Sequence, residues 1–174
     1  MTAPGRSRLD GKRPSDQDAP DRADRRGEAL QPFQTVADIL DEVEAAHARC
    51  REHYAAAARA AGDQRVAGLL GFLAARDAEH LTAIARVRSS HDDALSCYVQ
   101  NVPAKPLGVA LRLPPAAADV ERIVGGYVQR DLAFERTFTQ LEASVGPRAR
   151  AIFADLARMQ RQNQARLREA LLDF

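Results

Sequence analysis

The stretch AARAAGDQRVAGLL (residues 57–70) interrupts a helical pattern that continues on both sides of it. Gly62–Asp63 breaks the pattern, as is typical of a short turn between two helices. Apolar residues recur every three or four positions over 35–61 before the turn, and over 64–89 after it. We therefore expect two antiparallel helices, with Thr35 as the N-cap of the first.

A second pair of helices is expected in the C-terminal half. The apolar spacing predicts helices over 116–144 and 147–172, and Gly146–Pro147 forms the turn between them. The connector between the two pairs, 90–115, contains four prolines and cannot be one continuous helix. Two closed pairs and one long connector predict an all-α four-helix bundle with a single crossover. No strand-like alternation of useful length is present.

The composition is that of a soluble protein. Of 174 residues, 45% are hydrophobic and 28% are charged, and the net charge is +1. So small a net charge predicts no strong attraction to nucleic acid or to anionic lipid. No apolar run approaches the ~20 residues of a membrane span, and the N-terminus lacks the apolar stretch of a signal peptide. Only two cysteines, Cys50 and Cys97, are present, which favours a reducing, cytoplasmic location.

Residues 1–32 are predicted to be a disordered tail in front of a bundle that covers 33–174. The tail has seven basic and six acidic residues and almost no large apolar side chain before Leu30. Such a segment buries too little surface to offset the entropy of ordering. Two roles remain open for it: a solvated leader without a function, or a docking segment for a protein partner.

The first two predicted helices both carry polar residues on the stripe that is expected to be buried. Glu44 and His47 are three residues apart on one helix, and Asp77 and His80 are three apart on the next. This spacing places each pair on one helical face. Counting outward from the turn at Gly62–Asp63 places all four residues at the same height, so they form one polar layer.

The second helix pair continues this polar layer. Counting outward from its turn places Asp131 level with Gln160, and Asn163 follows Gln160 by three residues. The Tyr127 hydroxyl can join the same layer. If the helix is phased one turn differently, Glu135 takes the place of Asp131.

The arrangement resembles the ferritin-like superfamily, whose di-iron members carry Glu, Glu-x-x-His, Glu and Glu-x-x-His on four successive helices. Glu44 matches the first carboxylate, Asp77-Ala78-Glu79-His80 matches the first motif with Asp for Glu, and Asp131 matches the third carboxylate. Gln160-Arg161-Gln162-Asn163 stands in place of the second motif. Amides are weak, neutral ligands, so the resemblance implies a degenerate di-iron site without an intact oxidase centre.

We therefore expect one divalent metal ion in the middle of the bundle. The candidate ligands are the four residues of the first helix pair and one nearby carboxylate: Glu44, His47, Asp77, His80 and Asp131. Imidazoles and carboxylates together suit iron, manganese or zinc. Cys50, one turn after His47, would shift the preference toward zinc if its thiolate joined the site.

The alternative is a metal-free bundle that serves as an interaction or scaffold module. In that case His47 pairs with Asp77 and Glu44 pairs with His80, and the polar layer fixes the register of the helices. A homodimer formed through a helix face fits both interpretations. No Gly-rich phosphate loop, nucleophile elbow or Cys-x-x-Cys pair is present, so no catalytic residue is assigned.

Overall fold

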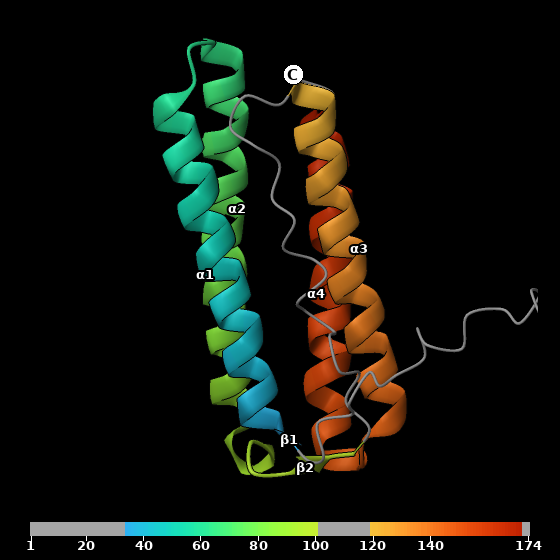
Figure 1. The fold of residues 1–174 in the computed structure, drawn as a ribbon. Coiled ribbons are helices and arrows are strands. Elements are labelled where there is room, and N and C mark those ends of the chain that lie inside the picture. The colour runs from blue at the N-terminus through green and yellow to red at the C-terminus, as the bar shows by residue number, and fades with distance from the viewer. Residues whose placement is uncertain (1–33, 101–118, 172–174) are drawn as a thin grey trace, which may run out of the picture.

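The computed structural model describes residues 34–100 and 119–171, which form four α-helices arranged as two hairpins (Figure 1). The helices are α1 (Val36–Ala60), α2 (Gln64–Ser90), α3 (Val120–Ser144) and α4 (Pro147–Leu171). The predicted all-α class is confirmed, and each helix lies within a few residues of its predicted range. The predicted tail at 1–32 lies outside the described residues, as do positions 101–118 of the connector and the third helix.

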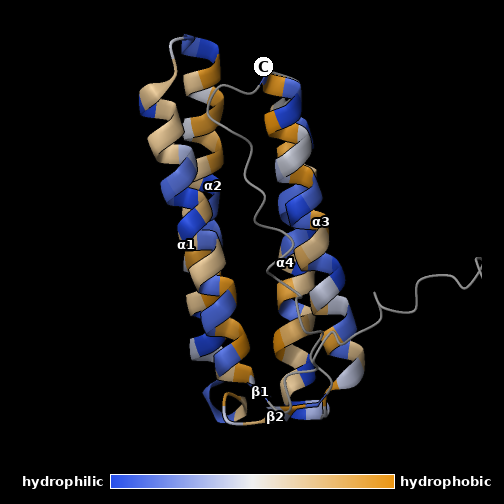
Figure 2. Ribbon diagram, viewed as in Figure 1, coloured by the Kyte–Doolittle hydropathy of each residue, from blue (hydrophilic) through white to orange (hydrophobic). Residues whose placement is uncertain are grey.

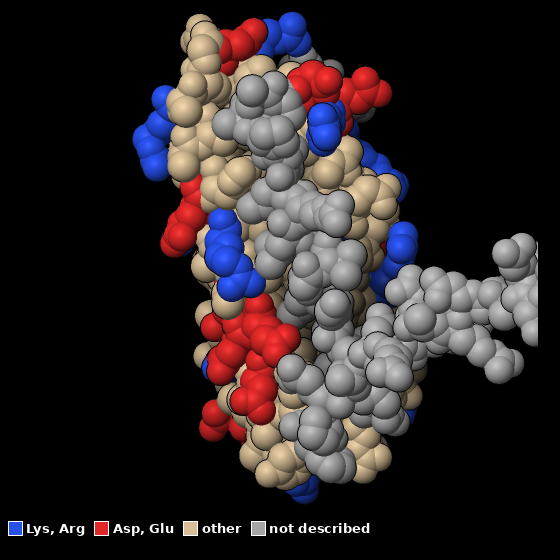
Figure 3. Space-filling model, in the orientation of Figure 1, with Lys and Arg blue, Asp and Glu red and all other residues tan. Residues whose placement is uncertain are grey.

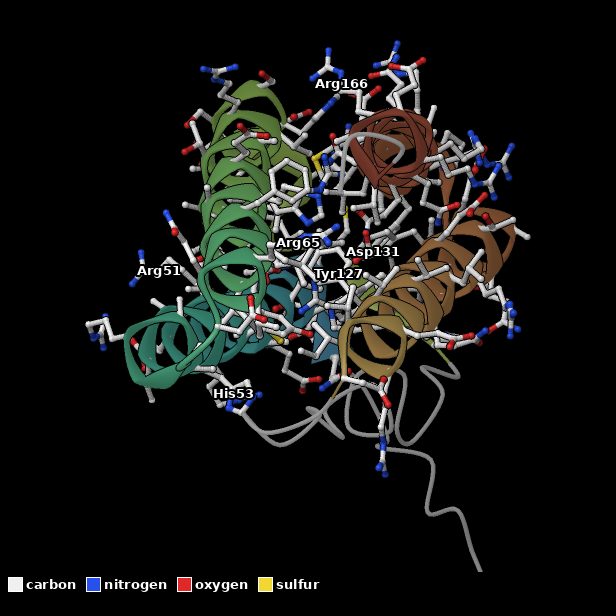
Figure 4. The ribbon with its side chains drawn as sticks, turned by 90° about the horizontal axis from the view of Figure 1, so that it is seen from above. Arg51, His53, Arg65, Tyr127, Asp131 and Arg166 are labelled. Carbon is white, nitrogen blue, oxygen red and sulfur yellow. The ribbon has the colours of Figure 1, made fainter. Side chains whose placement is uncertain are left out.

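Each hairpin consists of two antiparallel helices that pack against each other along their length. α1 and α4 run in one direction, and α2 and α3 run in the other (Figure 1). The packing is closest within each hairpin, and α2 and α4 make the main contact between the hairpins. Viewed from above, side chains from all four helices point into the space between the hairpins (Figure 4).

Side chains bond to the free amides at the start of both helices in the first hairpin. The Asp38 amide donates to the Thr35 hydroxyl at 3.1 Å, and the Thr35 amide donates to the Asp38 carboxylate at 2.9 Å. This capping box confirms the predicted N-cap. At the turn, the Asp63 carboxylate accepts from the amides of Arg65 and Val66, so α2 also begins with its free amides bonded.

The first hairpin is also closed at the end opposite its turn, by a feature that was not predicted. β1 (Gln34–Thr35) pairs in antiparallel fashion with β2 (Tyr98–Val99), which follows a short 3-10 helix at Asp92–Ala94. The Val36 amide also donates to the Cys97 carbonyl at 2.9 Å. Strands of two residues are too short to produce an alternating pattern, so the sequence gives no sign of them.

The described core consists of two apolar clusters with a polar layer between them. The cluster near the β1–β2 pair includes Val43, Ile84, Phe134 and Leu156, and the cluster near the α1–α2 turn includes Tyr54, Leu73, Ile123 and Leu167. On every helix, buried polar residues fall between members of the two clusters: His47, Arg76, Asp77, His80, Arg130, Asp131, Gln160 and Asn163. Figure 2 shows hydrophilic and hydrophobic residues alternating along all four helices, as expected for helices that share a core.

None of the helices in the described ranges combines the length and the low charge that a membrane span requires.

Candidate metal centre

Three residues of the predicted layer come together in the middle of the first hairpin. His47 Nδ1 on α1 lies 2.8 Å from Asp77 Oδ1 and 3.4 Å from His80 Nδ1, both on α2. One donor atom from each of the three residues lies within 4.8 Å of the other two, and all three side chains are buried. This group could hold a metal ion.

Aromatic packing holds the His47 ring in place. Its centroid lies 4.6 Å from that of Phe134 on α3, and the two rings are nearly parallel, 19° apart. The His80 ring meets His47 edge-on, with centroids 4.7 Å apart and planes at 90°. Because neighbours contact the imidazole on its face and at its edge, the donor atoms are held in position by the packed core and not by a surface loop.

The spacing of the donor atoms is close to that around a small divalent ion. Metal–ligand bonds of ~2.0–2.2 Å put two donors about 3.4 Å apart across a tetrahedral edge and at most about 4.4 Å apart. The two Nδ1 atoms of His47 and His80 are already at 3.4 Å. The 2.8 Å contact between His47 and Asp77 is a hydrogen bond, whose proton would have to leave if both atoms bound a metal.

The environment of His80 keeps its ring neutral. Burial, followed by the nearby His47, Arg130 and Arg76, lowers the pKa of His80 well below its usual value. A neutral imidazole has a free lone pair, which is the form that binds metals. Neither Nε2 atom of the two histidines has a hydrogen-bond partner within the described part of the chain.

Arg130 on α3 contacts the same carboxylate and was not among the predicted residues. Its Nη1 donates to Asp77 Oδ2 at 3.2 Å, and its Nη2 donates to Asp77 Oδ1 at 2.9 Å. Nη2 also lies 3.3 Å from Asp131 Oδ1. The guanidinium carbon is 4.1 Å from the Tyr127 ring centroid, at cation–π distance. A buried arginine thus links Asp77 on α2 to Asp131 on α3.

Asp131 is buried beside the group but is not part of it. Its Oδ2 has no hydrogen-bond partner among the residues that the structure describes. Burial raises the pKa of Asp131, and the charge of Arg130 opposes this rise. Figure 4 shows Asp131 and Tyr127 of α3 pointing into the middle of the molecule, whereas His53 of α1 points away from it.

Glu44 does not join the other three residues. Its Oε1 lies 3.4 Å from Arg88 Nε, and Arg88 also contacts Asp41. Acidic side chains gather on the surface over the N-terminal half of α1, the helix that carries Asp41 and Glu44 (Figure 3). At 100° per residue, position 44 is rotated about 60° from His47, so Val43 takes the buried position one turn earlier. The predicted pairing of Glu44 with His80 is therefore replaced by a surface ion pair.

The remaining candidates also lie outside the three-residue group. Glu135 pairs with Arg161 at 3.7 Å and accepts a hydrogen bond from Gln164 at 3.1 Å, so it does not replace Asp131. Cys50 is buried and not in a disulfide, and burial raises the pKa of its thiol. A protonated thiol is a poor metal ligand.

The fourth helix contributes amides and no charge to the layer. Gln160 is fully buried, and neither atom of its amide has a hydrogen-bond partner within residues 34–100 and 119–171. Asn163 accepts a hydrogen bond at its backbone oxygen from Arg76 Nη2, at 2.5 Å. Asn163 also lines a groove of about 390 Å³ between α2 and α4, together with Glu79, the neighbour of His80.

The spacing of Arg76 and Arg130 is the one local sign of their position, although it does not show what they bond to. Arg76 lies three residues after Leu73 and four before His80, and Arg130 lies three after Tyr127 and four before Phe134. Both arginines therefore occupy positions on buried helical stripes.

No family model, no curated protein and no solved structure matches this chain.

Proposed function

We propose that the protein binds one divalent metal ion of the iron type through His47, Asp77 and His80, at the centre of a ferritin-like helical bundle. The observation that carries the proposal is the convergence of three buried donor atoms within 4.8 Å. Buried imidazole and carboxylate groups are costly to maintain unless they are paired or bound to a metal.

The chemistry of the donor set supports iron(II) as the first candidate. Two imidazoles and one carboxylate are typical ligands of non-haem iron(II), which keeps further positions open for water or substrate. Manganese and zinc accept the same donors, and zinc would need a fourth ligand such as water. The groove between α2 and α4 is lined by Glu79, the sequence neighbour of His80, and by Asn163.

Three features support the ferritin-like part of the proposal. Asp77 and His80 lie three residues apart on the second helix, as in the first Glu-x-x-His motif of that superfamily. α2 and α3 run in the same direction (Figure 1). The ligand layer lies midway along the helices, between two apolar clusters.

A second candidate function is a metal-free scaffold, and one contact favours it. Arg130 already bonds to both oxygens of Asp77, so this carboxylate is paired without a metal. In a scaffold, the polar layer would serve to fix how the two hairpins pair.

Metal content separates the two candidates. The chain has four histidines, which divide into two in the centre, His47 and His80, and two outside it, His53 and His91. Untagged wild-type protein would be loaded anaerobically with Fe²⁺, Mn²⁺ or Zn²⁺, desalted and analysed for metal. We expect about one equivalent in the wild type and in the matched control H53A/H91A, and none in H47A/H80A. Circular dichroism would verify that each variant is helical. Wild-type protein that retains no metal, or H47A/H80A protein that retains it, would overturn the metal proposal.

A further inference from the structure

The charges buried around the centre balance one another without a metal ion. Two guanidinium groups, Arg76 and Arg130, are matched by two carboxylates, Asp77 and Asp131, and all four side chains are at most 5% exposed. A divalent ion would add two positive charges to this balanced set. The buried centre therefore receives a metal ion only against the repulsion of a cation that is already in place.

Arg130 and a bound metal ion would use the same carboxylate oxygens of Asp77. Asp77 Oδ1 accepts from Arg130 at 2.9 Å and lies 2.8 Å from His47 Nδ1, and Oδ2 accepts from Arg130 at 3.2 Å. Two parallel bonds from a guanidinium to a carboxylate are a strong, geometrically matched pair. A metal ion that binds Asp77 has to take over at least one of these acceptor positions.

Asp131 is placed to receive the displaced guanidinium. Its Oδ1 is already 3.3 Å from Arg130 Nη2, and its Oδ2 has no partner among the described residues. The Tyr127 ring, 4.1 Å from the guanidinium carbon, also stabilises the cation and does not depend on Asp77. Arg130 can thus stay charged and buried while one oxygen of Asp77 turns to the metal.

We infer that Arg130 is the residue that limits metal affinity, because it competes with the ion for Asp77. The inference rests on the proposed metal site. A competing role and a purely structural role for Arg130 predict opposite changes in metal affinity when Arg130 is replaced. An arginine that only orients Asp77 would weaken metal binding when it is replaced, whereas a competing cation would strengthen it.

The test compares the affinity of metal-free proteins for Zn²⁺ and for anaerobic Fe²⁺, by competition with a chelator of known affinity. In Arg130→Gln, the charge is removed and a polar side chain remains. Replacing a residue that only orients a metal ligand typically weakens metal binding about 10–100-fold, whereas removing a positive charge beside the ion removes a Coulomb repulsion and strengthens binding. We expect binding about tenfold or more tighter than in the wild type. Arg130→Lys, which keeps the charge but not the two parallel bonds, should bind more tightly by a smaller factor.

Arg76→Gln is the matched control. Arg76 is also buried and lies next to Asp77 in sequence, but its hydrogen bond within the described residues is to the Asn163 backbone and not to a carboxylate of the centre. Its replacement should therefore raise metal affinity much less than the replacement of Arg130, which bonds to Asp77 directly. An equal gain in affinity in both variants would overturn the specific role of Arg130 and leave only a general effect of charge.

Several outcomes separate this inference from the metal proposal itself. If the wild type binds one ion and Arg130→Gln binds it equally or more weakly, the inference fails and the metal site stands. If the wild type binds none but Arg130→Gln binds one ion that is lost in H47A/H80A/R130Q, the inference stands and the wild-type metal proposal fails. If Arg130→Gln does not fold without metal, Arg130→Lys decides: an affinity no higher than that of the wild type overturns the inference. No binding in any variant overturns both.

Discussion

The two hairpins contribute different chemistry to the same buried layer. The α1–α2 hairpin provides all three donors of the candidate centre, His47, Asp77 and His80. The α3–α4 hairpin provides the cation Arg130, together with a carboxylate oxygen of Asp131 and the amide of Gln160, which lack hydrogen-bond partners among residues 34–100 and 119–171. The donors of the proposed metal site thus lie in one hairpin, and the cation that we propose competes for one of them lies in the other.

The largest expected effect is on stability, where replacing Asp77 should cost more than replacing Asp131. Asp77→Asn removes the partner of Arg130 and of His47, and an unpaired buried charge typically costs about 3–5 kcal/mol. Asp131→Asn should lower the free energy of unfolding by less than Asp77→Asn does, because Arg130 keeps both of its bonds to Asp77 and loses one longer contact at 3.3 Å. Urea denaturation of the metal-free proteins measures both. Asp41→Asn, in a surface ion pair, is the control and should cost at most about 1 kcal/mol. Equal losses for Asp77 and Asp131 would contradict the asymmetry.

The donor side of the centre should also make the metal-free protein sensitive to acid. The folded-state pKa of His80 lies well below the ordinary 6.5, so below about pH 6.5 the unfolded chain binds a proton that the folded chain resists. Stability should therefore fall as the pH is lowered from 6.5, by at most ~1.4 kcal/mol per pH unit from this group. Chemical denaturation between pH 8 and pH 5 measures the slope. His80→Gln should flatten the profile and His53→Ala should not; equal slopes in the two variants would refute the assignment to His80.

A smaller change in stability is expected when Gln160, on α4, is replaced. Gln160→Met keeps a similar shape and removes two buried polar atoms that lack partners in the described residues. Such a replacement should be neutral or stabilise the protein by up to about 1 kcal/mol. This corresponds to a rise of about 2–4 °C in Tm for a chain of this size. A lower Tm would indicate that the Gln160 amide bonds to a water or an ion, and that the second hairpin contributes more to the centre than the contacts above suggest.

The sequence predicts those residues of the centre whose positions follow from helical geometry alone. Asp77 lies about as far after the turn as His47 lies before it, and His80 follows Asp77 by three residues on the same helical face, so the three residues come together. Glu44 shows the limit of this reasoning, because Glu44 and His47 have the same three-residue spacing as Asp77 and His80, yet Glu44 pairs with Arg88 instead of joining the group. Residues three apart point about 60° away from each other, and the spacing does not decide which of them the neighbouring helices cover.

Arg130 and Arg76 were missed for a different reason. Arginine is rarely fully buried, so an arginine on an apolar stripe does not by itself predict a buried side chain. Whether an arginine enters a core depends on its partners, and the partner of Arg130 is Asp77, 53 residues away on another helix. A local pattern cannot reveal such a pair. The two-residue strands were equally invisible, since their pairing is also set by distant contacts.

The β1–β2 pair makes the first hairpin a closed ring: the Gly62–Asp63 turn joins its helices at one end, and backbone bonds join them at the other. The amides of Val36 and Ala37, which at most helix starts exchange rapidly with solvent, donate here to the carbonyls of Cys97 and Leu95. Neither helix can slide by a turn along the other without breaking this closure. Closure at both ends therefore fixes the register of α1 against α2, and with it the distance between His47 and its two partners on α2.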